Sequence, residues 1–306
     1  MPRFDKGLLV YHANAGKTEI EHNLSQVLPV LAEAVKELIT VQTEGIDDLH
    51  LTAERYKQDI DVFFILGGDG TVHECVNIFA EVENPPVFGV LPAGTCNDFA
   101  RMLGLPMNLN QAAHQLVEGK GKKVDIGKSE GRYFANFWGI GLVTRTSHNI
   151  DEDQKDSLGV LSYFISAFKT MSGAETFSYQ MEVDGKKMEG EAVMLMVMNG
   201  SFIGTRQVPD PDVRIDDGYF NVMVIKDSNF RLFRELMTMS RPWTNEDNFR
   251  ELAYAKASHI KISTDPVEEV DQDGEIEGET PSEITLLPKR LSFLTGNVGT
   301  HVAFSE

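Results

Sequence analysis

The stretch Asp61-Val62-Phe63-Phe64-Ile65-Leu66-Gly67-Gly68-Asp69-Gly70-Thr71 decides the fold of the first part of the chain. Its first half is almost continuously apolar, which is typical of a central parallel strand buried on both faces. Its second half places three glycines ahead of a helical pattern over residues 71–79. Glycine lets the backbone approach a ligand closely, and the free N–H groups of a helix N-terminus suit a phosphate. The stretch therefore predicts a strand, a tight turn and a helix, with a phosphate site at the turn.

Asp69 adds a chemical constraint to this turn. Its carboxylate would repel a bare phosphate, so its presence favours a divalent cation between the two groups. Without any ligand, the same residues would form only a tight strand-to-helix turn. The continuation Asp69-Gly70-Thr71 favours the phosphate interpretation over the bare turn.

Strand-then-helix patterns surround this stretch on both sides. Short apolar strands are predicted at residues 8–11, 40–42 and 87–91. Amphipathic helices are predicted at residues 21–38 and 48–58. Such alternation is typical of an α/β domain with a parallel sheet.

The character of the chain changes after about residue 125. Apolar segments separated by Gly-, Asp- or Pro-bearing turns predict strands at residues 134–143, 179–183, 192–198, 219–225 and 259–262. Helical intervals are predicted at residues 159–171 and 231–239. The second part is therefore predicted to be a mostly antiparallel, β-rich domain.

Composition excludes several classes of protein. The chain of 306 residues has 28 Lys and Arg against 47 Asp and Glu, a net charge of −19, which argues against a nucleic-acid partner bound through a broad basic surface. Its two cysteines cannot form a disulfide framework or a four-thiolate zinc site. The sequence has neither a signal-peptide pattern nor an apolar run long enough for a transmembrane segment. We expect a cytoplasmic protein.

A second polar loop, Pro92-Ala93-Gly94-Thr95-Cys96-Asn97-Asp98-Phe99-Ala100-Arg101, also follows a buried strand. By itself, Asn97 or Asp98 could simply be the N-cap of a helix. Two loops with Gly, Thr and Asp at successive parallel strands favour a ligand site, because ligands of open α/β sheets bind outside the carboxyl ends of the strands.

These two loops resemble the diacylglycerol kinase catalytic-domain family, specifically its small soluble bacterial lipid kinases. Four further segments agree with that family in order and spacing over nearly the whole chain. They are Val124-Asp125-Ile126-Gly127, Phe134-Ala135-Asn136 with Gly139 and Gly141, Asp216-Asp217-Gly218-Tyr219, and Asp273-Gly274-Glu275.

The resemblance implies an ATP- and Mg²⁺-dependent kinase that phosphorylates the hydroxyl of a diacylglycerol-like lipid. It implies an ATP-binding α/β domain over residues 1–125, completed by residues 293–306. Residues 126–292 would form the β-rich domain that binds lipid and contributes catalytic residues. Such an enzyme would meet its lipid at the membrane surface and associate with it transiently. The sequence leaves open whether the protein forms a homodimer.

Roles for individual residues also follow from the resemblance. Glu275 matches the general base, with Asp273 and Asp69 as further catalytic candidates. ATP contacts map onto His12, Asn14, Gly16, Thr43, Gly67, Gly68, Asp69, Gly70, Thr71, Val72, His73, Thr95, Asn97 and Asp98. A structural Mg²⁺ maps onto the Asp217 carboxylate with the backbone carbonyls of Arg214 and Tyr219. Direct or water-mediated contacts with metal are expected of Asp69, Asp98, Asp125 and Asp273.

The sequence departs from the family pattern beside the expected phosphates. The family usually has Asn-Pro-x-Ser-Gly where this chain has His12-Ala13-Asn14-Ala15-Gly16, and an Asn where it has His73. Two alternatives stay open. One is an NAD kinase-like enzyme, because that superfamily shares the Gly-Gly-Asp-Gly loop and a two-domain layout. The other, which these departures favour, is a regulator that binds nucleotide or lipid without catalysis.

Two segments have competing interpretations. By default, the acidic run at residues 267–279 is interpreted as a solvated loop and its Asp273-Gly274 pair as a plain β-turn. The resemblance instead implies that this run contains the general base. The interval 230–243 mixes aromatic side chains with cations and could dock on a membrane. Packing of its Phe and Leu residues on the sheet is the more ordinary interpretation.

Overall fold

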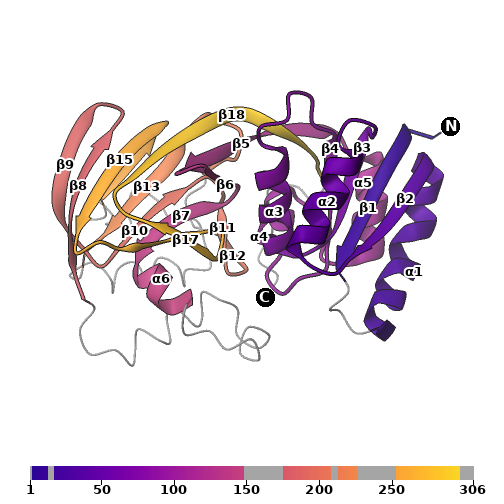
Figure 1. Ribbon diagram of the computed structural model, residues 1–306, viewed down its shortest axis with the longest axis horizontal. Helices are drawn as coiled ribbons and strands as arrows, with labels where there is room; N and C mark the ends of the chain where they lie inside the picture. Colours follow the sequence, from indigo (N-terminus) through magenta and orange to yellow (C-terminus); the bar gives the residue numbers. More distant parts are fainter. Residues whose placement is uncertain (1, 13–16, 148–174, 208–212, 227–252, 297–306) are drawn as a thin grey trace, which may run out of the picture. The chain divides into compact units, whose positions relative to one another are not determined.

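The apolar stretch before Gly67 forms β3 (Val62–Gly67), which lies inside a parallel sheet in the computed structural model (Figure 1). The structure describes residues 2–12, 17–147, 175–207, 213–226 and 253–296. The chain divides into two compact units, residues 1–124 with 289–306 and residues 125–288.

The first unit is a parallel sheet with helices on both faces (Figure 1). The sheet order is β2-β1-β3-β4-β18, and every neighbouring pair is parallel. Its strands are β1 (Phe4–His12), β2 (Val35–Thr43), β3, β4 (Val87–Pro92) and the end of β18 (Ser282–Leu294). Its helices are α1 (Lys17–Ala34), α2 (Ile46–Tyr56), α3 (Asp69–Phe79), α4 (Asp98–Met102) and α5 (Leu109–Glu118). The predicted parallel α/β fold is confirmed.

The end of β18 packs against the first unit through buried aromatic rings. Phe293 lies next to Phe88 with ring centroids 5.2 Å apart, and Phe88 lies 5.1 Å from Phe79. All three side chains are at most 1 % exposed. The end of β18 is therefore part of this core, although it is more than 150 residues from its neighbours in the sequence.

The boundary between α1 and β2 differs from the prediction. The helix predicted at residues 21–38 ends at Ala34, and β2 begins at Val35. β2 pairs with β1 in a parallel register that starts with Phe4 opposite Val35. This pairing with a distant strand makes residues 35–39 extended, although their mixture of charged and apolar residues also suits a helix.

The second unit contains two antiparallel sheets, which confirms the predicted β-rich class. One sheet has the order β14 (Ala253–Ala257), β13 (Phe220–Ile225), β10 (Met194–Met198), β7 (Phe137–Gly141), β16 (Glu269–Gln272) and β17 (Glu275–Glu279). The other contains the start of β18, β15 (His259–Asp265), β8 (Phe177–Val183) and β9 (Lys186–Ala192). The remaining elements are β5 (Gly121–Ser129), β6 (Arg132–Phe134), α6 (Leu142–Ser147), β11 (Phe202–Ile203) and β12 (Arg206–Gln207).

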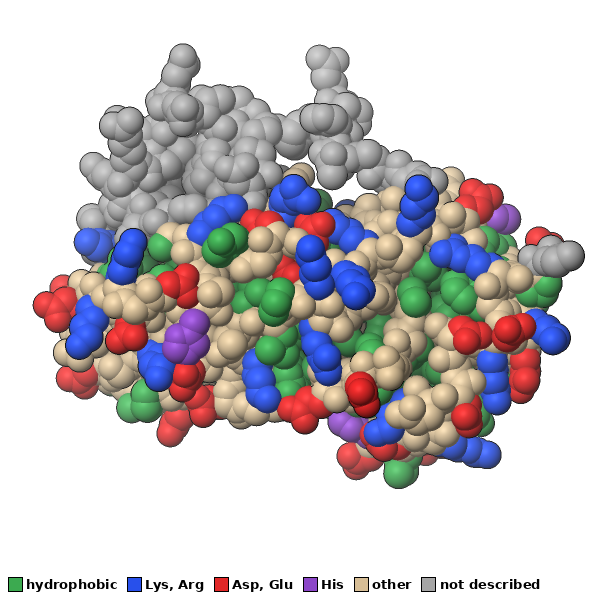
Figure 2. Space-filling model, turned by 90° about the horizontal axis from the view of Figure 1, so that it is seen from above, with side chains coloured by type: hydrophobic (Ala, Val, Ile, Leu, Met, Phe, Trp, Pro, Cys, Tyr) green, Lys and Arg blue, Asp and Glu red, His purple; other side chains and the backbone are tan. Residues whose placement is uncertain are grey.

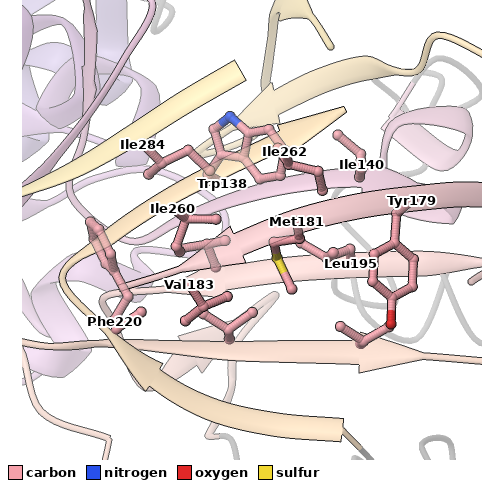
Figure 3. Close-up of a cluster of buried hydrophobic side chains, with 14 of the residues drawn as sticks. Trp138, Ile140, Tyr179, Met181, Val183, Leu195, Phe220, Ile260, Ile262 and Ile284 are labelled. Atoms are coloured by element: carbon pink, nitrogen blue, oxygen red, sulfur yellow. The ribbon is translucent and has the colours of Figure 1, made fainter. Parts of the chain in front are cut away.

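The core of the second unit lies between these two sheets (Figure 3). Trp138 and Leu195 come from the six-stranded sheet, and Met181, Ile260 and Ile284 come from the other. The Trp138 ring is completely buried, and its Nε1 has no hydrogen-bond partner among the described residues. The unit is therefore a β-sandwich with an apolar core.

One further prediction is corrected in this unit, and one open interpretation is decided. The strand predicted at residues 134–143 is divided into β6 and β7, and β7 ends at Gly141, where φ is +83° and α6 follows. For the acidic run at residues 267–279, the default interpretation as a solvated loop is wrong, because most of the run forms the β16–β17 hairpin. The helical intervals at residues 159–171 and 231–239 lie outside the described residues.

Within the part of the chain that the structure describes, no helix combines the length and hydropathy needed to cross a bilayer.

Candidate functional site

The predicted nucleotide-binding residues of the first unit gather at one edge of its sheet. His12 ends β1 opposite Thr43 at the end of β2, and Gly67 ends β3 opposite Pro92 at the end of β4. Because the strands are parallel, these four positions mark the carboxyl edge, where ligands of open α/β sheets bind. The Thr43 hydroxyl donates to the Tyr11 carbonyl at 3.3 Å. Asn14 and Gly16, also predicted here, lie outside the described residues.

Two glycine loops touch through their backbones at this edge. A Cβ atom on Gly94 would lie 2.5 Å from the Cα of Gly68, and a Cβ on Gly68 would lie 3.0 Å from the Cα of Gly94. Asn97 fixes the second loop: its Oδ1 accepts from Gly94 N at 2.9 Å and its Nδ2 donates to Gly94 O at 2.6 Å. Asn97 itself is left-handed, with φ of 53°. Only glycine at both contact positions permits this approach.

Asp69 links the two loops through a helix cap. Its carboxylate accepts the backbone N–H of Asp98 at 3.1 Å and of Phe99 at 3.0 Å, so it caps the first turn of α4. The structure thus gives Asp69 a role that the sequence did not predict. Asp98 is buried at the start of the same helix.

The two threonines of the loops differ in their surroundings. Thr71 folds back onto the preceding turn, so that a Cβ on Gly67 would meet its Oγ1 at 2.7 Å. Thr95 is exposed. The side chains of Val72 and His73 are both buried, and the Asn77 amide lies 3.2 Å from His73 Nε2. The side chains of Val72 and His73 therefore face the interior of the unit.

In the second unit, Asp273 and Gly274 form the turn of the β16–β17 hairpin. Their φ angles are 58° and 99°, both left-handed, as expected for an Asp-Gly hairpin turn. Glu275 follows directly as the first residue of β17, and its side chain is exposed. Its carboxylate makes no hydrogen bond or ion pair with any residue that the structure describes. The plain turn is therefore present, and it presents Glu275 to solvent.

The predicted metal-binding residues lie around a second turn. Asp217 Oδ1 accepts from Tyr219 N at 3.1 Å, and its Oδ2 lies 3.1 Å from Lys256 Nζ. The exposed Arg214 guanidinium pairs with Asp216, and that hydrogen bond raises the pKa of Arg214. A carboxylate and two backbone carbonyls are the oxygen ligands that Mg²⁺ takes, so the donor set fits such an ion. Any ion bound there would compete with Lys256 for Asp217.

Asp125 bonds to this turn, and Asn199 bonds to Asp125. Nothing in the sequence indicates that these two residues lie together. Asp125 is completely buried and its Oδ2 accepts from Gly218 N at 2.7 Å. The Asn199 amide donates to the carbonyls of Asp125 and Ala135, each at 2.7 Å. Sequence reasoning missed Asn199. A polar residue directly after the buried run of β10 was the available signal.

A surface pocket in the described part of the second unit is not lined by these residues. It has a volume of about 710 Å³ and is lined by side chains of β8, β9 and β15, including Gln180, Lys187 and Lys261. Acidic and basic groups are mixed along it, and no candidate site residue lines it. It resembles the solvated outer face of an antiparallel sheet.

Basic and acidic side chains are intermixed on one face of the molecule. On the face shown in Figure 2, Lys and Arg side chains are interspersed with acidic ones and with apolar patches, although the chain carries a net charge of −19. The interval 230–243, predicted as a candidate for membrane docking, lies outside the described residues.

Comparisons with known proteins agree with this arrangement. Residues 6–129 match the family described as diacylglycerol kinase catalytic domain, and residues 140–295 match the YegS C-terminal NAD kinase beta sandwich-like domain. A Staphylococcus haemolyticus protein named "Putative lipid kinase" is 38% identical over 301 residues, covering 96% of this chain and 97% of that protein. A Staphylococcus aureus protein of the same name is 32% identical over 300 residues, covering 96% and 98%.

A solved structure shows the same fold. The crystal structure of a protein from Bacillus anthracis, described as a "putative diacylglycerol kinase", superposes with a TM-score of 0.89 at 36% identity. The match covers 97% of this chain and 99% of that one. Identity and coverage of this extent confirm the resemblance seen in the motifs, and the chain belongs to the diacylglycerol kinase catalytic-domain family of lipid kinases.

Proposed function

We propose that this protein is an ATP- and Mg²⁺-dependent kinase that transfers the γ-phosphate of ATP to the hydroxyl of a diacylglycerol-like lipid. The observation that supports this most is the backbone contact between Gly68 and Gly94 at the carboxyl edge of the parallel sheet. The first loop leads into the N-terminus of α3, whose backbone N–H groups suit a polyphosphate at that edge. The second loop lies against it, and the first N–H groups of α4 bond to Asp69.

In this proposal the first unit binds ATP. The backbone of Gly68–Thr71 and the exposed Thr95 would donate hydrogen bonds to phosphate oxygens. Bound Mg²⁺ would neutralise phosphate charge near the carboxylates of Asp69 and Asp98. Asp69 already caps α4, so in this role it would hold the two loops together as well as balance charge.

The second unit would supply the base. As the lipid oxygen attacks the γ-phosphorus, Glu275 would accept the hydroxyl proton, and the bond to the leaving ADP would break. An exposed carboxylate at the tip of a hairpin is accessible to a lipid hydroxyl. Transfer of a proton to a positioned carboxylate is ordinary general base catalysis.

Transfer of labelled phosphate to a lipid tests this proposal. The purified protein would be incubated with γ-labelled ATP and mixed micelles that carry a diacylglycerol, a monoacylglycerol or a sphingoid base, with NAD as a soluble control. We expect labelled lipid with Mg²⁺ and none with excess EDTA. Labelled NAD would instead favour the NAD kinase-like alternative, which the description of the C-terminal match keeps relevant. Bound ATP without any labelled product would favour a regulator.

Thiol reactivity provides a test of the nucleotide site that does not need turnover. Cys96 lies beside Thr95 and is partly exposed, whereas burial raises the pKa of the Cys75 thiol, to which Glu74 adds. A disulfide reagent at pH 8 should therefore modify one thiol in the native protein and two in urea. Saturating ATP with Mg²⁺ should slow the native reaction. An unchanged rate would place ATP away from the loop of residues 94–98.

A further inference from the structure

We infer that Asp273, supported by Asp271, is a positioning residue that holds Glu275 in place rather than a group that touches substrate or metal. The inference rests on the proposed role of Glu275 as base.

The Asp273 carboxylate accepts hydrogen bonds from three backbone donors. Its Oδ1 accepts from Asn136 N at 2.8 Å and from Phe137 N at 2.9 Å, and its Oδ2 accepts from Ala135 N at 2.7 Å. Its own N–H donates to the Phe137 carbonyl at 3.0 Å. Charge-assisted bonds of this kind are strong, and both oxygens are occupied. These hydrogen bonds join the turn of the β16–β17 hairpin to residues 135–137, between β6 and the start of β7.

Asp271 stabilises the same turn through a hydrogen bond across it. It is completely buried on β16, and its Oδ1 accepts from Gly274 N at 2.7 Å. The bond spans the turn between the two strands, so residues 271–274 form a closed loop. No sequence motif pointed to Asp271, because a lone Asp in an acidic run reads as a solvated residue.

Glu275 needs such an anchor because of its place in the sheet. It begins β17, which is the last strand of the six-stranded sheet and, among the described strands, pairs with β16 alone. A strand held along one side and exposed at its first residue has few contacts to fix its side chains. The bonds of Asp273 and Asp271 fix the backbone immediately before Glu275. A displacement of about 1 Å at a catalytic group can cost about 100-fold in rate.

The same unit contains a second Asp-Gly turn of this kind, which serves as a matched control. Asp184 and Gly185 form the turn of the β8–β9 hairpin with φ angles of 45° and 82°. The Asp184 carboxylate accepts from Ser258 N at 3.2 Å, from Ser258 Oγ at 3.1 Å and from His259 N at 2.9 Å. The construction is the same, an Asp-Gly turn anchored to a neighbouring segment. The residue that follows is Lys186, which belongs to no candidate site.

Asp273→Ala and Asp184→Ala, compared in the full-length protein, test the inference. Each removes a carboxylate that accepts hydrogen bonds from three donors of a neighbouring segment, so both should lower the unfolding temperature. We expect Asp273→Ala to lower kcat about 100-fold with the KM for ATP unchanged. Asp184→Ala should leave both unchanged. Equal kcat values for the two variants would overturn the inference.

A double variant separates positioning from a direct role. If Asp273 acts through Glu275, Asp273→Ala should cost almost nothing further in the Glu275→Gln background. Multiplied losses would show an independent role, such as binding metal, and would contradict the inference. An active Glu275→Gln variant would instead overturn the proposed base itself. The two failures are therefore distinguishable.

A conservative variant covers the case in which Asp273→Ala does not fold. Asn tolerates the left-handed conformation. Its Oδ1 can keep the bonds from Asn136 and Phe137, whereas its Nδ2 is a donor and cannot replace the Oδ2 atom that accepts from Ala135 N. Asp273→Asn should therefore fold and retain most of the kcat that Asp273→Ala loses. A fully folded Asp273→Asn as inactive as Glu275→Gln would show that the negative charge itself is needed, and positioning would be rejected.

Discussion

Glu275→Gln is expected to lower turnover about 1000-fold, within the range contributed by a positioned general base. Gln has nearly the same shape as Glu, but its amide cannot take the proton of an attacking hydroxyl. The side chain is exposed and none of the described residues bonds to its carboxylate, so the substitution removes no hydrogen bond or ion pair from the described part of the chain. Stability should stay within about 0.5 kcal/mol of the parent, as for most surface substitutions.

The measurement compares kcat, the KM for ATP and the unfolding temperature with those of Glu279→Gln. Glu279 ends the same strand and is also exposed, so it controls for loss of one negative charge on β17. ATP should bind equally well to both variants, because Glu275 belongs to the second unit. A Glu275→Gln enzyme with near-parental kcat would remove Glu275 from the mechanism and reopen the choice of base.

The fold class could be predicted because the deciding signals are local. β3 is a run of apolar residues that ends in glycines and is followed by a helical pattern, and β4 repeats that order. No distant residue is needed to interpret either run. The sequence failed where a distant partner decides the conformation. β2 is extended because it pairs with β1, and the α1–β2 boundary was therefore misplaced.

The candidate site shows the same division. The loop residues of the first unit could be found because each follows a strand directly. What each side chain does there depends on pairs that no spacing reveals, such as Asp69 with the N–H groups of Asp98 and Phe99. The bonds of Asp273 to residues 135–137 join positions more than 130 apart in the sequence. A motif can therefore identify a polar residue without showing whether it binds a ligand or holds the backbone.

Gly94→Ala should abolish ATP binding, because it places a methyl group where another backbone already lies. The new Cβ would stand 2.5 Å from the Cα of Gly68 and 3.1 Å from Asn97 Oδ1. A backbone atom cannot rotate away as a side chain can, so the two loops must separate. Forced insertions into packed regions typically cost about 1–3 kcal/mol. The larger effect falls on function, since both loops carry groups of the proposed phosphate site.

Gly121→Ala is the matched control for this substitution. It lies in the first unit, and a Cβ there would meet nothing within 4 Å. Both substitutions reduce the freedom of the unfolded chain in the same way, so their difference isolates the contact between the loops. Urea unfolding should show a loss of stability for Gly94→Ala alone, and calorimetry should show ATP binding for Gly121→Ala alone. If Gly94→Ala binds ATP with the parental Kd, the contact between Gly68 and Gly94 does not form the nucleotide site, and the proposed function loses its main support.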